Sequence, residues 1–146
     1  MANPDHLSLL KQSVDVWNQW RQEHPEIQAD LRGANLARTR LSGGNLKGAM
    51  LNDANLHWVR LIAADLSGAD LSGADLSGAD LRWADLSGAA LYMANLTGAN
   101  LNRTRFNGAD LRGANLRGAL MKGISLDGAI LNGTLFSNED VTSPSE

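Results

Sequence analysis

The segment Ala64-Asp65-Leu66-Ser67-Gly68 is followed at once by two identical copies, and its five-residue frame extends from the unit centred on Leu31 to the one centred on Phe136. Among these 22 units the central position is Leu in 19, and the exceptions are Phe106, Met121 and Phe136. The position two residues earlier is Ala in 16 units. Alternate residues of an extended segment point to the same face, so these two apolar columns are expected to form a continuous core.

Glycine marks the end of each unit. Of the 15 glycines, 14 lie two residues after the central position. Gly is the default residue where the backbone turns sharply or takes a positive φ, so each unit is expected to be a short flat side followed by a corner. A helix does not fit, because a period of five would rotate the Leu column around the axis of a 3.6-residue helix. The frame therefore predicts an all-β solenoid over residues 29–136.

The frame Ala-(Asp/Asn)-Leu-x-Gly resembles the pentapeptide-repeat family across residues 29–136. The resemblance implies a right-handed quadrilateral β-helix in which four units make one coil. Residues 20 apart would then stack about 4.8 Å apart, as in any strand ladder. The Asp/Asn position, directly before the central residue of each unit, then forms a column along each side. In these columns Asp65 lies next to Asp85, whereas the other acids are separated by uncharged or basic residues. The column through Asn35 and Asn55 could form a ladder of side-chain hydrogen bonds.

Residues 1–28 lie outside the repeat, and we predict that they form an N-terminal capping helix. Asn3 and Pro4 are typical of a helix start, and His24-Pro25 should end the helix. Apolar residues recur at helical spacing, and Val16 widens the apolar face that they form. The expected cap residues are Leu10, Val14, Trp17 and Trp20. A stacked solenoid must cover its terminal core, which favours a cap over the alternative that the two Trp bind a partner. The stretch 17–21 also resembles leaders of cyanobacterial members of the family.

The carboxyl end has no comparable helix. The polar column becomes apolar at Leu120, Ile130 and Leu135, and residues 137–146 are rich in Ser, Asp and Glu. This composition predicts a disordered tail. Two interpretations stay open: a monomer whose frayed final coil is protected by Phe136 and the tail, or a C-terminal end-to-end homodimer, which some members of the family form.

Catalytic groups are hard to find in this chain. It contains no Cys, and His6, His24 and His57 are scattered without metal-ligand spacing. Asp65 and Asp85 form the best carboxylate pair, but a flat exposed side gives none of the shielding that separates two pKa values. We therefore expect no enzyme, no catalytic residue, no metal, no cofactor and no small-molecule substrate. With no long apolar run and no secretion pattern, we expect no membrane association and a cytoplasmic location.

One side of the solenoid carries an unusual set of outward residues. These are basic or aromatic residues on the units centred on Leu41, Leu61, Leu81, Leu101 and Met121, or at the corner before them. The candidate interaction face consists of Arg38, Arg40, Trp58, Arg60, Arg82, Trp83, Arg103 and Lys122. Exposed Trp and Arg are typical of interaction hot spots. The alternative is that Arg38 with Trp58, and Arg103 with Trp83, are ordinary cation–π pairs worth about 0.5–1 kcal/mol.

Two function classes follow. The first is a non-catalytic structural or protein-protein interaction module, a regulatory one included, with an unidentified protein partner. The second is a DNA mimic that binds a type II topoisomerase, as the quinolone-resistance members of the family do. Charge disfavours the second, because residues 29–136 hold nine Asp and no Glu against eleven Lys and Arg. A DNA mimic needs dense negative charge, and this modest positive excess is too small to predict nucleic-acid binding.

Overall fold

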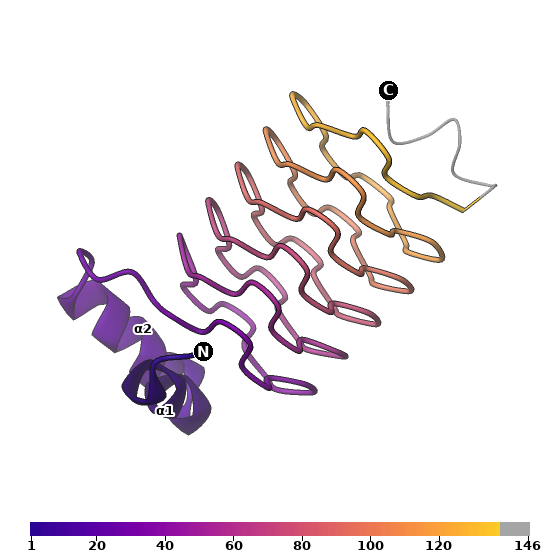
Figure 1. Ribbon diagram of the computed structural model, residues 1–146. Coiled ribbons are helices and arrows are strands. Elements are labelled where there is room, and N and C mark those ends of the chain that lie inside the picture. Colours follow the sequence, from indigo (N-terminus) through magenta and orange to yellow (C-terminus); the bar gives the residue numbers. More distant parts are fainter. Residues whose placement is uncertain (138–146) are drawn as a thin grey trace.

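The computed structural model describes residues 1–137. Figure 1 shows a stack of similar coils, with two helices lying against the coil at its N-terminal end. Helix α1 spans Pro4–Gln12 and helix α2 spans Val14–Glu23. We call the units centred on Leu31, Leu36, Leu41 and Leu46 the first coil, and those centred on Met121, Leu126, Leu131 and Phe136 the last coil.

The coils are joined by parallel bridges between residues 20 apart, from Asp30 with Met50 to Asn115 with Leu135. Four five-residue units therefore make one coil, as expected. Each bridge is isolated, and residues 1–137 contain no longer strand. A corner at every fifth residue leaves each flat side too short for the continuous ladder of an ordinary β-strand.

The backbone N–H groups of a unit all have partners, which explains how so tight a coil is stable. Two bond to the next coil and one to the preceding coil, one closes the turn, and one bonds to a side chain. In one unit these bonds are Leu66 N to Asp85 O (2.8 Å), Ser67 N to Asp65 Oδ1 (3.0 Å), Gly68 N to Ser87 O (2.9 Å), Ala69 N to Leu66 O (3.0 Å) and Asp70 N to Ala49 O (2.9 Å).

The Asp/Asn column owes its composition to that side-chain bond. The side-chain oxygen accepts the amide hydrogen two residues later, as Asn95 does from Thr97 at 3.0 Å. This is the Asx turn that short polar side chains form with their own backbone. The expected asparagine ladder is therefore wrong as a general feature, because the side-chain oxygens bond to backbone amides of their own unit. Its one step within residues 1–137 is Asn55 Nδ2 to Asn35 Oδ1, at 3.3 Å.

The core consists of the two expected apolar columns. Every central Leu from Leu31 to Leu116 is at most 2 % exposed, and Phe106 is fully buried among them. Thr replaces Ala at a few inward positions without leaving a polar atom unpaired. Thr104 Oγ1, for example, donates to the Leu81 carbonyl at 2.7 Å. The inward assignment of both columns is therefore confirmed.

The leader forms two helices, so the expectation of a single helix is wrong. Asn3 caps α1 as expected, because its side chain accepts the amide hydrogens of Asp5 and His6. The chain then becomes extended at Ser13, with φ −173° and ψ 161°, and the Ser13 side chain caps α2 through the Val16 amide. A Ser that can cap a second helix favours this break. The break turns Val16 outward, where it is 37 % exposed, instead of adding it to the packed face.

The helices replace a preceding coil on two sides of the first coil. Asn3 N donates to Asp30 O at 2.9 Å, and Asp30 N donates to His6 Nδ1 at 3.0 Å. On the adjoining side, Asn45 N donates to Asn18 Oδ1 at 2.8 Å, and Asn45 O accepts from Trp17 Nε1 at 2.7 Å. The backbone amide of Asn3 and side chains of the two helices thus take over ladder bonds that the first coil would otherwise lack.

The four expected cap residues differ in burial. Trp17 is fully buried and Leu10 is 2 % exposed, whereas Val14 and Trp20 are half-buried. Trp20 stands among other rings, with centroids 4.9 Å from His6, 5.2 Å from Trp17 and 5.6 Å from His24. The division of the chain at residues 28 and 136 stays a prediction.

At the other end the core is less covered. Met121, Leu126, Leu131 and Phe136 are partly buried, and the three apolar residues of the outer column are exposed by 56 % at Leu120, 44 % at Ile130 and 39 % at Leu135. The expected tail falls outside the described residues except for Ser137, whose Oγ accepts the Gly118 amide hydrogen at 2.7 Å.

Candidate functional site

The corners of the solenoid hold the first part of the candidate site. Among residues 1–137 all the corner residues have positive φ, and seven of them are not Gly. These are Arg38, Asp53, Trp58, Ala63, Trp83, Met93 and Arg103. A side chain in this left-handed region costs about 1 kcal/mol or more relative to Gly. Four of the seven belong to the predicted interaction face.

The two Trp of that face combine this backbone strain with exposure. Trp58 has φ 58° and is 53 % exposed, and Trp83 has φ 64° and is 62 % exposed. Neither conformation nor burial therefore accounts for an indole at these corners. Strain retained at a particular position is a recognised property of functional sites.

Each Trp lies beside the arginine expected from the 20-residue register. The Arg38 guanidinium carbon lies 6.0 Å from the Trp58 ring centroid, and that of Arg103 lies 5.1 Å from the Trp83 centroid. Trp58 also covers Gly78, where an added Cβ would come within 2.8 Å of the indole. The absence of a side chain at Gly78 is what leaves room for the Trp58 ring.

Between the two Trp corners runs the basic side, defined by the units centred on Leu41, Leu61, Leu81, Leu101 and Met121. Arg40 bridges Arg60, and Arg60 in turn bridges Asp80. Asp80 is held by Arg82 through two hydrogen bonds, of 2.9 Å from Nε and 2.7 Å from Nη2. The bonds from Arg82 lower the pKa of Asp80 below its usual value, although burial opposes this shift. Arg82 is thus the member of the face whose charge is paired.

The other cations of the face form no ion pair within the part of the chain that the structure describes. Within residues 1–137 the ion pairs are Arg32 with Asp30, Arg82 with Asp80, Arg105 with Asp85, and Arg112 with Asp110. Arg40, Arg60, Arg103 and Lys122 are exposed, and none has an ion-pair partner there. The basic side therefore presents more positive than negative charge between two exposed indoles.

A hollow of about 430 Å³ lies on this side and joins part of the predicted set. Its polar and aromatic lining comes from Trp58, Arg60, Asp80, Arg82 and Asn100. This volume lies at the lower end of the range of ordinary binding sites. The structure thus brings Trp58, Arg60 and Arg82 together.

The other predicted residues lie around this hollow. Arg38 stacks on its Trp58 rim, and Trp83 with Arg103 occupies the opposite corner of the basic side. Arg40 and Lys122 belong to the first and last coils, about 19 Å apart at the usual ladder spacing. They do not line the hollow.

A second exposed group was not predicted from the sequence. Tyr92 and Met93 are 51 % and 58 % exposed, and the Arg112 guanidinium carbon lies 5.7 Å from the Tyr92 centroid. Met93 also has φ 60°. The five-residue frame could have indicated this group, because Met93 stands at the corner position where most units have Gly.

The carboxylate pair gives no support for acid-base chemistry. Asp65 and Asp85 bridge as expected from the register. Burial raises the pKa of Asp85, but hydrogen bonding by Ser87 and the charge of Arg105 lower it more, so it ends below its usual value. A general acid needs the opposite shift.

Among residues 1–137 no three His, Asp or Glu side chains gather as metal ligands, and no helix there is long and apolar enough to span a membrane.

The repeat is also found by comparison with known proteins. A model of pentapeptide repeats matches residues 29–68, 64–103 and 104–138, in eight copies. The chain belongs to the pentapeptide-repeat family. The resemblance read from the frame is thereby confirmed. A comparison with curated protein sequences gave no match.

Solved structures of pentapeptide-repeat proteins resemble this one. The cyanobacterial protein Rfr23 from Cyanothece 51142 is 30 % identical with a TM-score of 0.60, over 83 % of this chain and 94 % of Rfr23. A trypsin-treated variant of QnrB1, a plasmid-mediated fluoroquinolone resistance protein, is 21 % identical with a TM-score of 0.60. That match covers 71 % of this chain and 59 % of the QnrB1 variant, and at this identity it shows the fold alone.

Proposed function

We propose that this pentapeptide-repeat protein is a non-catalytic interaction module that binds a protein partner through its basic side. The observation that supports this most is the pair of strained, exposed indoles at Trp58 and Trp83. Exposed Trp next to unpaired Arg is the composition of interface hot spots, where aromatic rings and guanidinium groups are desolvated together. The partner is expected to present acidic and apolar groups.

The test exploits the strain at the corners. Replacing Trp58 or Trp83 by Gly removes the side chain and relieves the left-handed backbone. The relief of about 1 kcal/mol roughly offsets the lost cation–π contact of about 0.5–1 kcal/mol. The free energy of unfolding should therefore change by less than about 1 kcal/mol, while recovery of the partner from native cell extract is abolished.

Matched controls locate the surface. Met93→Gly makes the same change at an exposed, left-handed corner on another side, and it should leave partner recovery intact. Arg60→Glu should abolish recovery without changing the melting temperature, because exposed charges contribute little to stability. Retained binding in all the basic-side variants would assign the partner to another surface.

The alternative is a DNA mimic acting on a type II topoisomerase. The structural similarity to the QnrB1 variant favours it. The charge of this protein disfavours it, because the acids of the repeat are outnumbered by Lys and Arg and several are paired with Arg. We expect purified protein at stoichiometric amounts neither to inhibit supercoiling by gyrase nor to relieve its inhibition by quinolones. Dose-dependent activity in either assay would reverse this order.

The remaining parts of the proposal concern assembly and place. We expect a right-handed coil, a cytoplasmic location, and either a monomer or a C-terminal end-to-end dimer. The exposed Leu120, Ile130 and Leu135 favour the dimer. Sedimentation of the wild type and of Leu120→Asp would separate the two states, because a charge in an end-to-end interface should prevent association.

A further inference from the structure

The N-terminal edge of the first coil is covered on two sides and open on the other two. Within the stack, a column residue such as Asp70 bonds to the preceding coil through both its N–H and its C=O, at 2.9 and 2.7 Å. Asp30 and Asn45 have these bonds from the helices. The N–H and C=O groups of Asn35 and Arg40 have no hydrogen-bond partner among residues 1–137.

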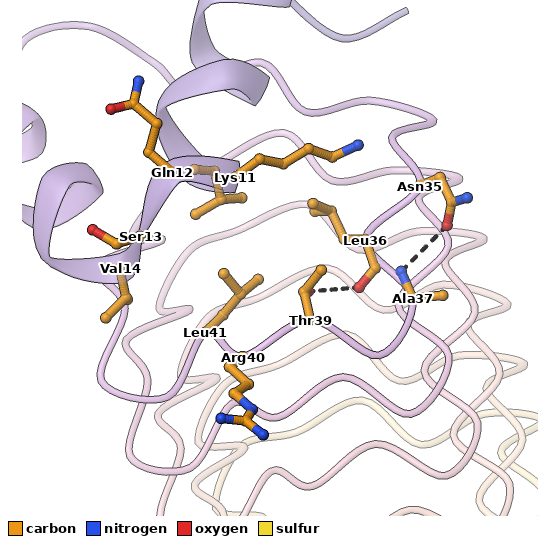
Figure 2. Close-up of a pocket in the computed structure, with 11 residues that line it drawn as sticks. Lys11, Gln12, Ser13, Val14, Asn35, Leu36, Ala37, Thr39, Arg40 and Leu41 are labelled. Carbon is orange, nitrogen blue, oxygen red and sulfur yellow. Dashed lines mark hydrogen bonds between the residues drawn. The ribbon is translucent and has the colours of Figure 1, made fainter.

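A hollow of about 650 Å³ lies over these open groups. It is bounded by the end of α1, the break before α2 and the first coil, and its lining includes Lys11, Ser13, Val14, Asn35, Leu36 and Arg40. Figure 2 shows these residues, with the Lys11 side chain extending from α1 toward the part of the pocket where Asn35 and Leu36 lie. The volume falls within the range of ordinary binding sites.

The break at Ser13 explains why the hollow is on these sides. The chain enters α2 beside Gly44, where an added Cβ would be 3.2 Å from Val14 Cγ2. From there α2 places Asn18 and Trp17 over Asn45. The helices therefore lie close to one half of the first coil and cannot reach the ladder groups of the other half.

The charges around the hollow have one sign. Lys11 and Arg40 are the charged residues that line it, and both are exposed. Arg40 bridges Arg60 on the side facing the second coil, so that neighbour adds positive charge. Inside the stack, Arg60 of the same column has Asp80 as its neighbour in the next coil. A carboxylate opposite Arg40 would repeat that arrangement.

We propose that this open edge binds an extended acidic segment of a partner protein by adding it to the ladder. Main-chain groups of the segment pair with the N–H and C=O of Asn35 and Arg40, which is β-augmentation at a sheet edge. Two five-residue units of extended chain span the two open sides, with an acidic side chain opposite Arg40 and near Lys11. The site differs from the basic side in its use of backbone groups and of Lys11.

A peptide of this chemistry provides the experiment. The probe is a labelled peptide, Ala-Asp-Leu-Ser-Gly-Ala-Asp-Leu-Ser-Gly, which is the sequence of residues 64–73. Titration into the full-length protein should shift the amide NMR signals of Asn35 and Arg40. Lys11→Glu and Arg40→Glu should each weaken binding about tenfold, which corresponds to about 1.4 kcal/mol. The same peptide N-methylated at its pairing amides should not bind.

Controls separate this site from the basic side. Lys47→Glu changes an exposed cation of the first coil that does not line the hollow, and Arg82→Glu disrupts the basic side, so both should retain peptide binding. Loss of binding in Arg82→Glu would move the peptide to the basic side and overturn the proposal. It would also be overturned by the absence of amide shifts at about 1 mM peptide, by equal binding of the N-methylated peptide, or by shifts confined to the last coil.

Discussion

The two ends of the solenoid are built from the same repeat but differ in how well their cores are covered. In the first coil Leu31, Leu36 and Leu46 are fully buried, whereas Leu126 and Leu131 of the last coil are only partly buried. Both sets stand at the centre of the five-residue frame. What differs is the neighbour, because α1 and α2 lie over the first coil (Figure 1). Burial of a terminal repeat is thus determined by the segment stacked on it.

The largest effect is expected where the helices cover the first coil. Trp17→Ala removes a fully buried indole and its 2.7 Å bond to the Asn45 carbonyl. The free energy of unfolding should fall by about 3–5 kcal/mol, as measured by urea denaturation. Trp83→Ala, at a corner that is 62 % exposed, should cost less than about 1 kcal/mol. Equal losses would mean that α2 does not protect the core.

Matched Leu replacements compare the ends with the middle. Leu71 is fully buried in the middle of the stack, and Leu131 lies on the same side in the last coil. Leu71→Ala should cost about 2–5 kcal/mol, and Leu131→Ala less than about 2 kcal/mol, because less apolar surface is withdrawn from water there. If both variants lost the same stability, the C-terminal core would have to be covered in solution, as in an end-to-end dimer.

A smaller effect tests the hydrogen bonds that replace the missing ladder. Asn18 accepts the Asn45 amide hydrogen at 2.8 Å and donates to the Gly43 carbonyl at 3.1 Å. Asn18→Ala should cost about 1–3 kcal/mol and speed hydrogen exchange at the Asn45 amide, because that group loses its partner. Gln19→Ala, one residue along on the exposed face of α2, should leave that amide protected.

The smallest effect concerns acid. The Arg32 hydrogen bond lowers the pKa of Asp30 from 3.8 to about 2. Because the pKa is lower in the folded state, this carboxylate stabilises the protein above about pH 4, and its contribution is lost as the pH falls toward 2. Asp30→Asn should therefore flatten the loss of stability between pH 5 and 2. Ile130→Asn, in the same column of the last coil, should leave the pH profile unchanged.

The repeat made much of the fold predictable. The Leu and Ala columns indicated the core, the Gly column indicated the corners, and stacking of Trp58 on Arg38 followed once residues 20 apart were neighbours. The break at Ser13 was missed because helical spacing of apolar residues continues through it, and a Ser inside a helix costs little by propensity alone. The asparagine ladder was wrong as a general feature, because the side-chain oxygens of that column accept amide hydrogens of their own unit.

The candidate site was predictable as a set of residues and less so as a geometry. Sequence placed Trp58, Arg60 and Arg82 on one side, but the pairing of Arg82 with Asp80 depends on side-chain conformation. The left-handed conformation of Trp83 could have been inferred, since it stands in the Gly column. The Tyr92 group was missed because a single exposed aromatic is common and carries no signal by itself.

The sequence by itself determined the inward columns and the corners, because these depend on a period that every unit repeats. The resemblance of that repeat to the family supplied the four-unit register. The tertiary structure decided where that regularity ends. Which ladder groups of the first coil are paired depends on how α1 and α2 lie on it, and the open edge at Asn35 and Arg40 follows from that contact. A repeat determines the interactions between its copies, but the interactions at its ends involve segments that do not repeat, and these must be seen in place.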